Sequence, residues 1–131
     1  MPERAYSAMH LSPLLPLVWV GPSRQDLRDC PAPVQRIIGK ALLQAQRGEH
    51  AVTAKRLRGD LAGLVEIVDD FDGNTYRAVY TTKLAGAIYV LHVFQKKATR
   101  GIATPKHELD LIKTRLRRAR EHHAAHRHAE D

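Results

Sequence analysis

The chain has 131 residues, of which 44% are hydrophobic and 27% are charged. This length suits one domain, which can bury a core without disulfides or metals. The single cysteine, Cys30, excludes an internal disulfide framework and is typical of a reducing compartment. Lys and Arg number 21 against 14 Asp and Glu, so the formal net charge is +7. The excess predicts an acidic partner: nucleic acid, a membrane surface or an acidic protein.

The sequence argues against a membrane protein. No stretch approaches the ~20 apolar residues that a bilayer-spanning helix needs. The most apolar N-terminal run is interrupted by Pro13 and Pro16 and lacks the basic and continuous hydrophobic segments of a signal peptide. We therefore expect a cytoplasmic protein that does not bind membranes. Residues 1–16 should be a loose extension in which Met1 and Met9 are both candidate start residues.

The first predicted elements are a short buried strand over residues 17–20 and a short helix. Ser23, with Asp26 three residues later, predicts the start of this helix, which should run to about Asp29.

The clearest helix follows Pro33 and ends at Gly48. Its apolar residues form one stripe at helical spacing: Val34, Ile37, Ile38, Ala41, Leu42 and Ala45. Gly39 interrupts this helix, where a glycine costs about 1 kcal/mol relative to alanine. We expect that a neighbouring element packs closely against Gly39.

After a polar, basic connection over residues 49–60, the sequence predicts three consecutive strands. They span residues 64–70, 75–82 and 87–95. Asp72-Gly73-Asn74 is a strong hairpin signal between the first two strands, and residues 83–86 form the second turn.

The last predicted helix begins at Thr104 and Pro105 and ends near Arg120, and the His-rich tail over residues 121–131 is expected to fray. Residues 17–120 then form the single domain. The order β-α-α-β-β-β-α predicts an α+β fold with helices packed on a largely antiparallel sheet.

The two turns predict the register of the strands. The first turn places Glu66 opposite Val79 and Val68 opposite Arg77, and a four-residue second loop places Arg77 opposite His92. One face is then apolar: Val65, Ile67, Tyr76, Ala78, Tyr80, Tyr89, Leu91 and Val93. The other face carries Glu66, Arg77 and His92 among Val68, Val79, Val90 and Phe94.

A carboxylate, a guanidinium and an imidazole on one face suit phosphodiester chemistry. Arg77 offers a planar fork to phosphate, and His92 can carry a proton near neutral pH. The alternative is a structural ion pair between Glu66 and Arg77 beside a satisfied, partly buried His92.

Basic residues lie at the ends of the predicted strands and could border one groove for a polyanion, or form a solvated rim. They are Lys55, Arg56, Arg58, Lys83, Lys96, Lys97 and Arg100. The cations of the last helix are expected to be a solvated face: Lys113, Arg115, Arg117, Arg118 and Arg120.

Two histidines of the tail, His122 and His126, have metal-chelating spacing if the helix continues, but no partner ligands accompany them. The sequence also has no Gly-rich phosphate loop. We therefore expect neither a metal nor a cofactor.

Several motifs occur together and in order along the chain. They are Trp19-Val20-Gly21, Gly39-Lys40-Ala41-Leu42, Thr75-Tyr76-Arg77-Ala78-Val79-Tyr80 and Tyr89-Val90-Leu91-His92-Val93-Phe94-Gln95-Lys96-Lys97. Over residues 17–120 the chain resembles the phage-derived Gp49-like, HigB-like branch of the RelE/ParE toxin superfamily.

This resemblance implies a compact RelE-like toxin that is neutralised by a helix-turn-helix antitoxin. The toxin would contact operator DNA only through this antitoxin. HigB-like members cleave mRNA on the translating ribosome without a metal, by attack of a ribose 2′-OH on the adjacent phosphate. The implied catalytic residues are Arg77 for phosphate charge, His92 as general acid or base, and Lys96 for added charge. The implied RNA-binding residues are Lys55, Arg58, Lys83, Lys97 and Arg100. Glu66 is a base or a structural partner of Arg77.

Two other functions remain open at this point. A ParE-like toxin inhibits DNA gyrase by binding and performs no RNA chemistry, and it shares the fold. A non-catalytic basic module that binds nucleic acid is the second alternative. His92 beside a lysine pair favours the endoribonuclease.

Overall fold

The computed structural model describes residues 14–96 and 104–130. In chain order the elements are β1 (Leu17–Trp19), α2 (Ser23–Arg28), α3 (Ala32–Gln46), β2 (Ala54–Arg56), the 3-10 helix η1 (Gly59–Leu61), β3 (Leu64–Phe71), β4 (Asn74–Thr81), β5 (Ile88–Lys96) and α4 (Lys106–Glu130). The strands form one five-stranded sheet in the order β1-β5-β4-β3-β2. Only β1 pairs in parallel, with β5, so the predicted α+β class with a largely antiparallel sheet is confirmed.

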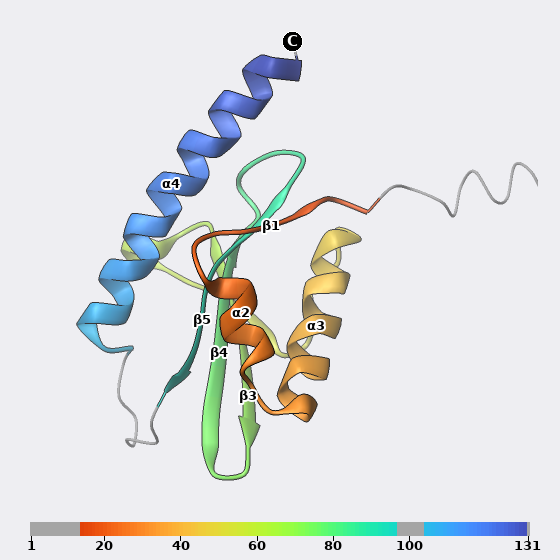
Figure 1. Ribbon diagram of the computed structural model, residues 1–131, viewed down its shortest axis with the longest axis vertical. Coiled ribbons are helices and arrows are strands. Elements are labelled where there is room, and N and C mark those ends of the chain that lie inside the picture. The colour runs from red at the N-terminus through yellow and green to blue at the C-terminus, as the bar shows by residue number, and fades with distance from the viewer. Residues whose placement is uncertain (1–13, 97–103, 131) are drawn as a thin grey trace, which may run out of the picture.

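Helices cover both faces of this sheet (Figure 1). The apolar stripe of α3 packs on one face, where Val34, Ile38 and Leu42 meet Ile67, Ala78 and Tyr80. On the other face, Ile112 and Leu116 of α4 pack with Val79, Leu91 and Phe94. We call these two surfaces the α3 face and the α4 face.

The predicted hairpin between β3 and β4 is confirmed. Asp72 and Gly73 both have positive φ angles, 52° and 78°, as the two central residues of a type I′ turn require. Val68 consequently pairs with Arg77, and Glu66 pairs with Val79.

The predicted register between β4 and β5 is wrong. Arg77 pairs with Phe94, not with His92, because two one-residue shifts add up. The second turn is one residue longer than expected, so Thr81 pairs with Tyr89, and the ladder shifts again between Val79 and Tyr80. Val79 pairs with His92 and Tyr80 with Val90, so the bulge inserts Leu91 as an extra residue.

The longer turn exchanges the faces of the β5 residues that lie between the turn and the bulge. Ile88 and Val90 belong to the core on the α3 face, whereas Tyr89 and Leu91 pack on the α4 face. Beyond the bulge the alternation returns to the predicted phase, with Val93 on the α3 face.

The chain on both sides of α3 is more ordered than expected. Residues 54–56 of the predicted connection form the edge strand β2, too short to show an alternating pattern. Residues 1–13 lie outside the described part of the chain, but Leu15 does not belong to a loose extension. Its backbone N–H donates to the carbonyl of Gln46 over 2.9 Å, and the Gln46 side-chain amide donates to the Leu15 carbonyl over 2.9 Å.

Helix α4 continues to Glu130 rather than fraying near Arg120, and it extends past the end of the sheet (Figure 1). Its histidines find partners: the Tyr89 hydroxyl lies 2.7 Å from Nδ1 of His122, and His123 Nε2 donates to the Ala85 carbonyl over 2.8 Å. Of the helices in the described residues, none has both the length and the apolar composition to cross a bilayer.

Gly39 does not serve close packing, contrary to expectation. A Cβ atom built there meets no atom within 4 Å, and no positive φ is recorded for it. We expect Gly39→Ala to raise the free energy of unfolding by about 0.5–1 kcal/mol, because alanine restricts the unfolded chain and favours helix. Urea denaturation would measure this gain.

Gly48 provides the matched control. It also has open space around it, but its φ is +80°. Gly48→Ala should therefore lose about 1–2 kcal/mol. A Gly39→Ala variant that is destabilised as much as Gly48→Ala would contradict the prediction.

Candidate active site

Four polar residues, one from each of four neighbouring strands, meet on the α4 face. Lys55 of β2 and Arg77 of β4 both contact Glu66 of β3. Lys96 of β5 lies two residues after Phe94, the pairing partner of Arg77, and therefore shares its face. We call Lys55, Glu66, Arg77 and Lys96 the basic cluster.

Glu66 is the centre of the basic cluster. The Nη1 atom of Arg77 donates to Oε1 of Glu66 over 2.7 Å, and Nζ of Lys55 lies 3.5 Å from the same oxygen. The side chain of Glu66 is 5% exposed and that of Arg77 is 15% exposed. A short, charge-assisted contact at this depth fixes the guanidinium in place. The contact is the Glu66–Arg77 pair that the sequence allowed as a structural alternative.

The charges of the other three residues affect the pKa of Lys96. Partial loss of hydration and the positive charges of Arg77 and Lys55 lower its pKa, while Glu66 raises it. Three cations against one carboxylate leave an excess of positive charge, so the basic cluster favours an anion such as a phosphate. A lysine with a lowered pKa also gives up its proton more readily than an ordinary one.

His92 lies apart from this cluster, beneath α4. The ring of Phe94 stacks on its imidazole with the centroids 4.6 Å apart. Nδ1 of His92 is 2.8 Å from Nη1 of Arg115, and its Nε2 is 3.1 Å from Oε2 of Glu108. The expected grouping of His92 with Glu66 and Arg77 does not form, because the longer turn and the bulge together move His92 two positions along β5 relative to Arg77.

The partners of His92 determine its tautomer. A guanidinium only donates hydrogen bonds, so Nδ1 must accept and Nε2–H must donate to Glu108. Burial has the largest effect and lowers the pKa of His92. Glu108 raises this pKa and Arg115 lowers it, and the resulting pKa lies below the ordinary value of a histidine. His92 is thus held as a neutral, buried ring.

Arg115 is not part of a solvated face, contrary to expectation. It is 8% exposed, and its Nη1 also donates to the carbonyl of Leu91 over 3.1 Å. The sequence did contain a signal for Arg115 and Glu108. Leu109, Ile112, Leu116 and Ala119 form the apolar stripe of the last helix, and Arg115 and Glu108 fall beside it, three residues after Ile112 and four residues before it.

Lys83, another predicted RNA-binding residue, does not border one groove with Lys96. Lys83 follows the end of β4 and lies against Gly63, and Arg58 follows β2 at the same end of the sheet. Lys96 pairs with Thr75, eight residues from Lys83 along the chain, which corresponds to about 26 Å at the rise of a strand. The remaining two, Lys97 and Arg100, lie outside the described residues.

A metal site was not expected from the sequence. In residues 14–96 and 104–130, no three His, Cys, Asp or Glu side chains are grouped so that they could hold a metal ion.

Comparisons with known proteins point to one family. A family model described as phage-derived protein Gp49-like (DUF891) matches residues 25–117. The toxin–antitoxin complex RelBE2 from Mycobacterium tuberculosis is a similar solved structure, with a TM-score of 0.47 and 19% identity over 64% of this chain and 100% of that chain. A search of curated proteins finds no significant match.

Proposed function

The chain belongs to the phage-derived Gp49-like family, and we propose that it is the toxin of a toxin–antitoxin pair and cleaves mRNA on the ribosome. The observation that carries this proposal is the basic cluster, in which Arg77 is fixed by Glu66 between two lysines. The resemblance of residues 17–120 to HigB-like toxins supplies the ribosome as the place of action and a helix-turn-helix antitoxin as the partner.

The cluster contains two groups that RNA cleavage uses, a guanidinium for the phosphate charge and an ammonium that can donate a proton. The ribose 2′-oxygen attacks the adjacent phosphorus, forming a cyclic phosphate and breaking the bond to the 5′-oxygen. The hydroxyl proton passes to water, and the departing 5′-oxygen takes a proton from the ammonium group of Lys96. Negative charge grows on the phosphate oxygens as the bond forms, and the preorganised guanidinium of Arg77 stabilises it.

The remaining residues have supporting roles in this proposal. Lys55 is 60% exposed and attracts the RNA backbone. Glu66 orients Arg77 and is not the base, because its contacting oxygen already receives two cations. His92 acts as a positioning residue that joins β5 to α4 through Glu108 and Arg115.

Induced alone in bacteria, the chain is expected to arrest growth, and co-expression of the antitoxin should restore it. Primer extension on translated mRNAs should reveal new 5′ ends within coding regions, and the same RNA without ribosomes should remain largely intact. Because side chains supply the positive charge, a phenanthroline chelator should not reduce cleavage when Mg²⁺ is kept to preserve the ribosome.

The same experiment separates the proposal from its alternatives. DNA breaks and inhibited gyrase with intact mRNA would identify the ParE-like toxin instead. Soluble, accumulated protein that leaves growth and mRNA unchanged would contradict the toxin proposal.

A further inference from the structure

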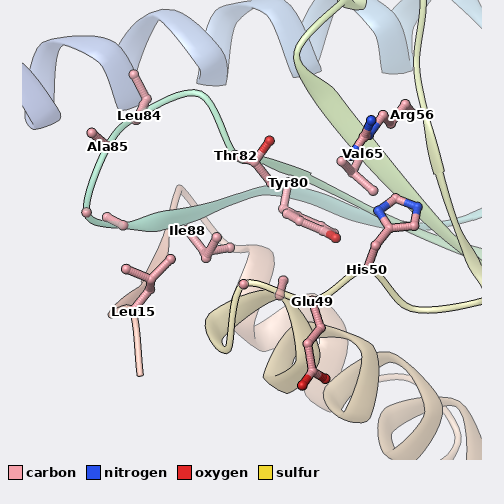
Figure 2. Close-up of a pocket in the computed structure, with 14 residues that line it drawn as sticks. Leu15, Glu49, His50, Arg56, Val65, Tyr80, Thr82, Leu84, Ala85 and Ile88 are labelled. Atoms are coloured by element: carbon pink, nitrogen blue, oxygen red, sulfur yellow. The ribbon is translucent and has the colours of Figure 1, made fainter. Parts of the chain in front are cut away.

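A pocket of about 280 Å³ opens on the α3 face, on the side of the sheet opposite the basic cluster. It lies between the C-terminal end of α3, the edge strand β2 and the loop that joins β4 to β5 (Figure 2). Arg56 reaches this side because it pairs with Val65, whereas its neighbour Lys55 pairs with Glu66 on the α4 face. The pocket is therefore a second site, independent of the proposed RNA chemistry.

The hydroxyl of Tyr80 is the main polar feature of this pocket. Tyr80 is 1% exposed; no described residue hydrogen-bonds its hydroxyl, which keeps access to the pocket and is not among the fully buried atoms that lack a partner. Figure 2 shows this hydroxyl pointing toward the ring of His50 across the pocket. A hydroxyl that opens into a pocket bonds water there, and an acceptor atom of a ligand can replace that water.

The charges around the pocket favour an anion with a single negative charge. Arg56 has no ion-pair partner among the described residues, yet it is close enough to lower the pKa of Tyr80, which burial raises. His50 donates its Nε2–H to the carbonyl of Ala54, 3.0 Å away, so Nδ1 of the neutral ring is an acceptor and gives no donor to an anion, which leaves Arg56 and Tyr80 as the donors. The carboxylate of Glu49 points away from Tyr80 in Figure 2 and so leaves the charge of Arg56 uncompensated.

The opposite wall is apolar. Leu15 and Ile88 line it together with the methyl groups of Ala45 and Ala87. An apolar wall facing a few convergent polar groups is typical of a small-molecule site. A ligand that matches both sides has an apolar body and one anionic end, and a guanidinium recognises a carboxylate through paired hydrogen bonds.

We propose that this pocket binds a small organic acid, with its carboxylate between the Tyr80 hydroxyl and the Arg56 guanidinium and its alkyl chain against Leu15 and Ile88. The carboxylate accepts the hydrogen bond that Tyr80 cannot make within the described chain.

Hexanoate titrated into the full-length protein at millimolar concentration tests the proposal by amide NMR. The amides of Arg56, Tyr80 and Ile88 should shift in a saturable manner, and hexanol at equal concentration should not produce these shifts. Tyr80→Phe and Arg56→Gln should each weaken binding about 10-fold or more, as expected for loss of a hydrogen bond to a charged group. Arg36→Gln removes an exposed arginine of α3 outside the pocket and should leave the affinity unchanged.

Three results would overturn the inference. They are the absence of saturable shifts with hexanoate, equal shifts with hexanol, and unchanged affinity in Tyr80→Phe when its unfolding curve matches that of the wild type. None of them bears on RNA cleavage, because the pocket and the basic cluster lie on opposite faces of the sheet.

Discussion

Arg77→Ala is expected to lower the rate of mRNA cleavage by about 10²–10³, which is typical when one electrostatic donor to a transition state is removed. The side chain is fixed by Glu66, so its charge is in place before the phosphate arrives. Arg77→Lys should restore little activity, because an ammonium group cannot reproduce the fork of the guanidinium. Cleavage on ribosomes, measured at saturating toxin, would report the loss in rate.

A structural role for Arg77 makes a different prediction, which a second variant distinguishes. Arg77→Ala leaves the buried carboxylate of Glu66 with only the more distant Lys55, and some loss of stability is expected. Adding Glu66→Ala removes the stranded charge and should recover much of the stability but none of the cleavage. If the double variant cleaves mRNA like the wild type, the catalytic assignment of Arg77 is wrong.

The parts of the fold that were predictable depend on local patterns. The apolar stripe of α3 and the Asp-Gly turn between β3 and β4 are each determined by a short segment of the sequence. A turn of known length also determines the register after it, so the placement of Glu66 near Arg77 followed from counting.

The errors come from features that depend on the rest of the molecule. Nothing in the residues around Leu91 marks a bulge, and its extra residue, added to the longer second turn, moves His92 two positions away from Arg77. At Gly39 the local sequence was misleading, because a glycine within a helix suggested close packing that the described residues do not make.

The longer turn and the bulge together explain why one predicted polar group became two. On β4 and β3, Arg77 and Glu66 remain on the part of the α4 face that joins Lys55 and Lys96. On β5, His92 moves beneath α4, where a histidine, a carboxylate and a guanidinium satisfy one another. The first group has excess positive charge for a substrate, and the second fastens α4 to the sheet.

We expect substitutions in the second group, which consists of His92, Glu108 and Arg115, to have the larger effect on the free energy of unfolding. Arg115→Met keeps the apolar stem but removes the donor that the Leu91 carbonyl and Nδ1 of His92 share. Two buried acceptors then lack a partner, and we expect a loss of about 2–4 kcal/mol in the free energy of unfolding. Arg118→Met, an exposed arginine of the same helix, should change stability by no more than about 0.5 kcal/mol.

The pH dependence of this loss identifies its cause. In the wild type the folded-state pKa of His92 lies below its unfolded value, so the unfolded chain takes up a proton first and stability falls as the pH drops below about 6.5. Arg115→Met removes one charge that lowers this pKa and frees Nδ1, while Glu108 still favours the protonated ring. The folded variant therefore accepts the proton more easily, and the difference from the wild type should be largest near pH 8 and smaller near pH 5. Urea unfolding of both proteins across this range measures the difference, and a constant gap would show that His92 does not titrate against Arg115.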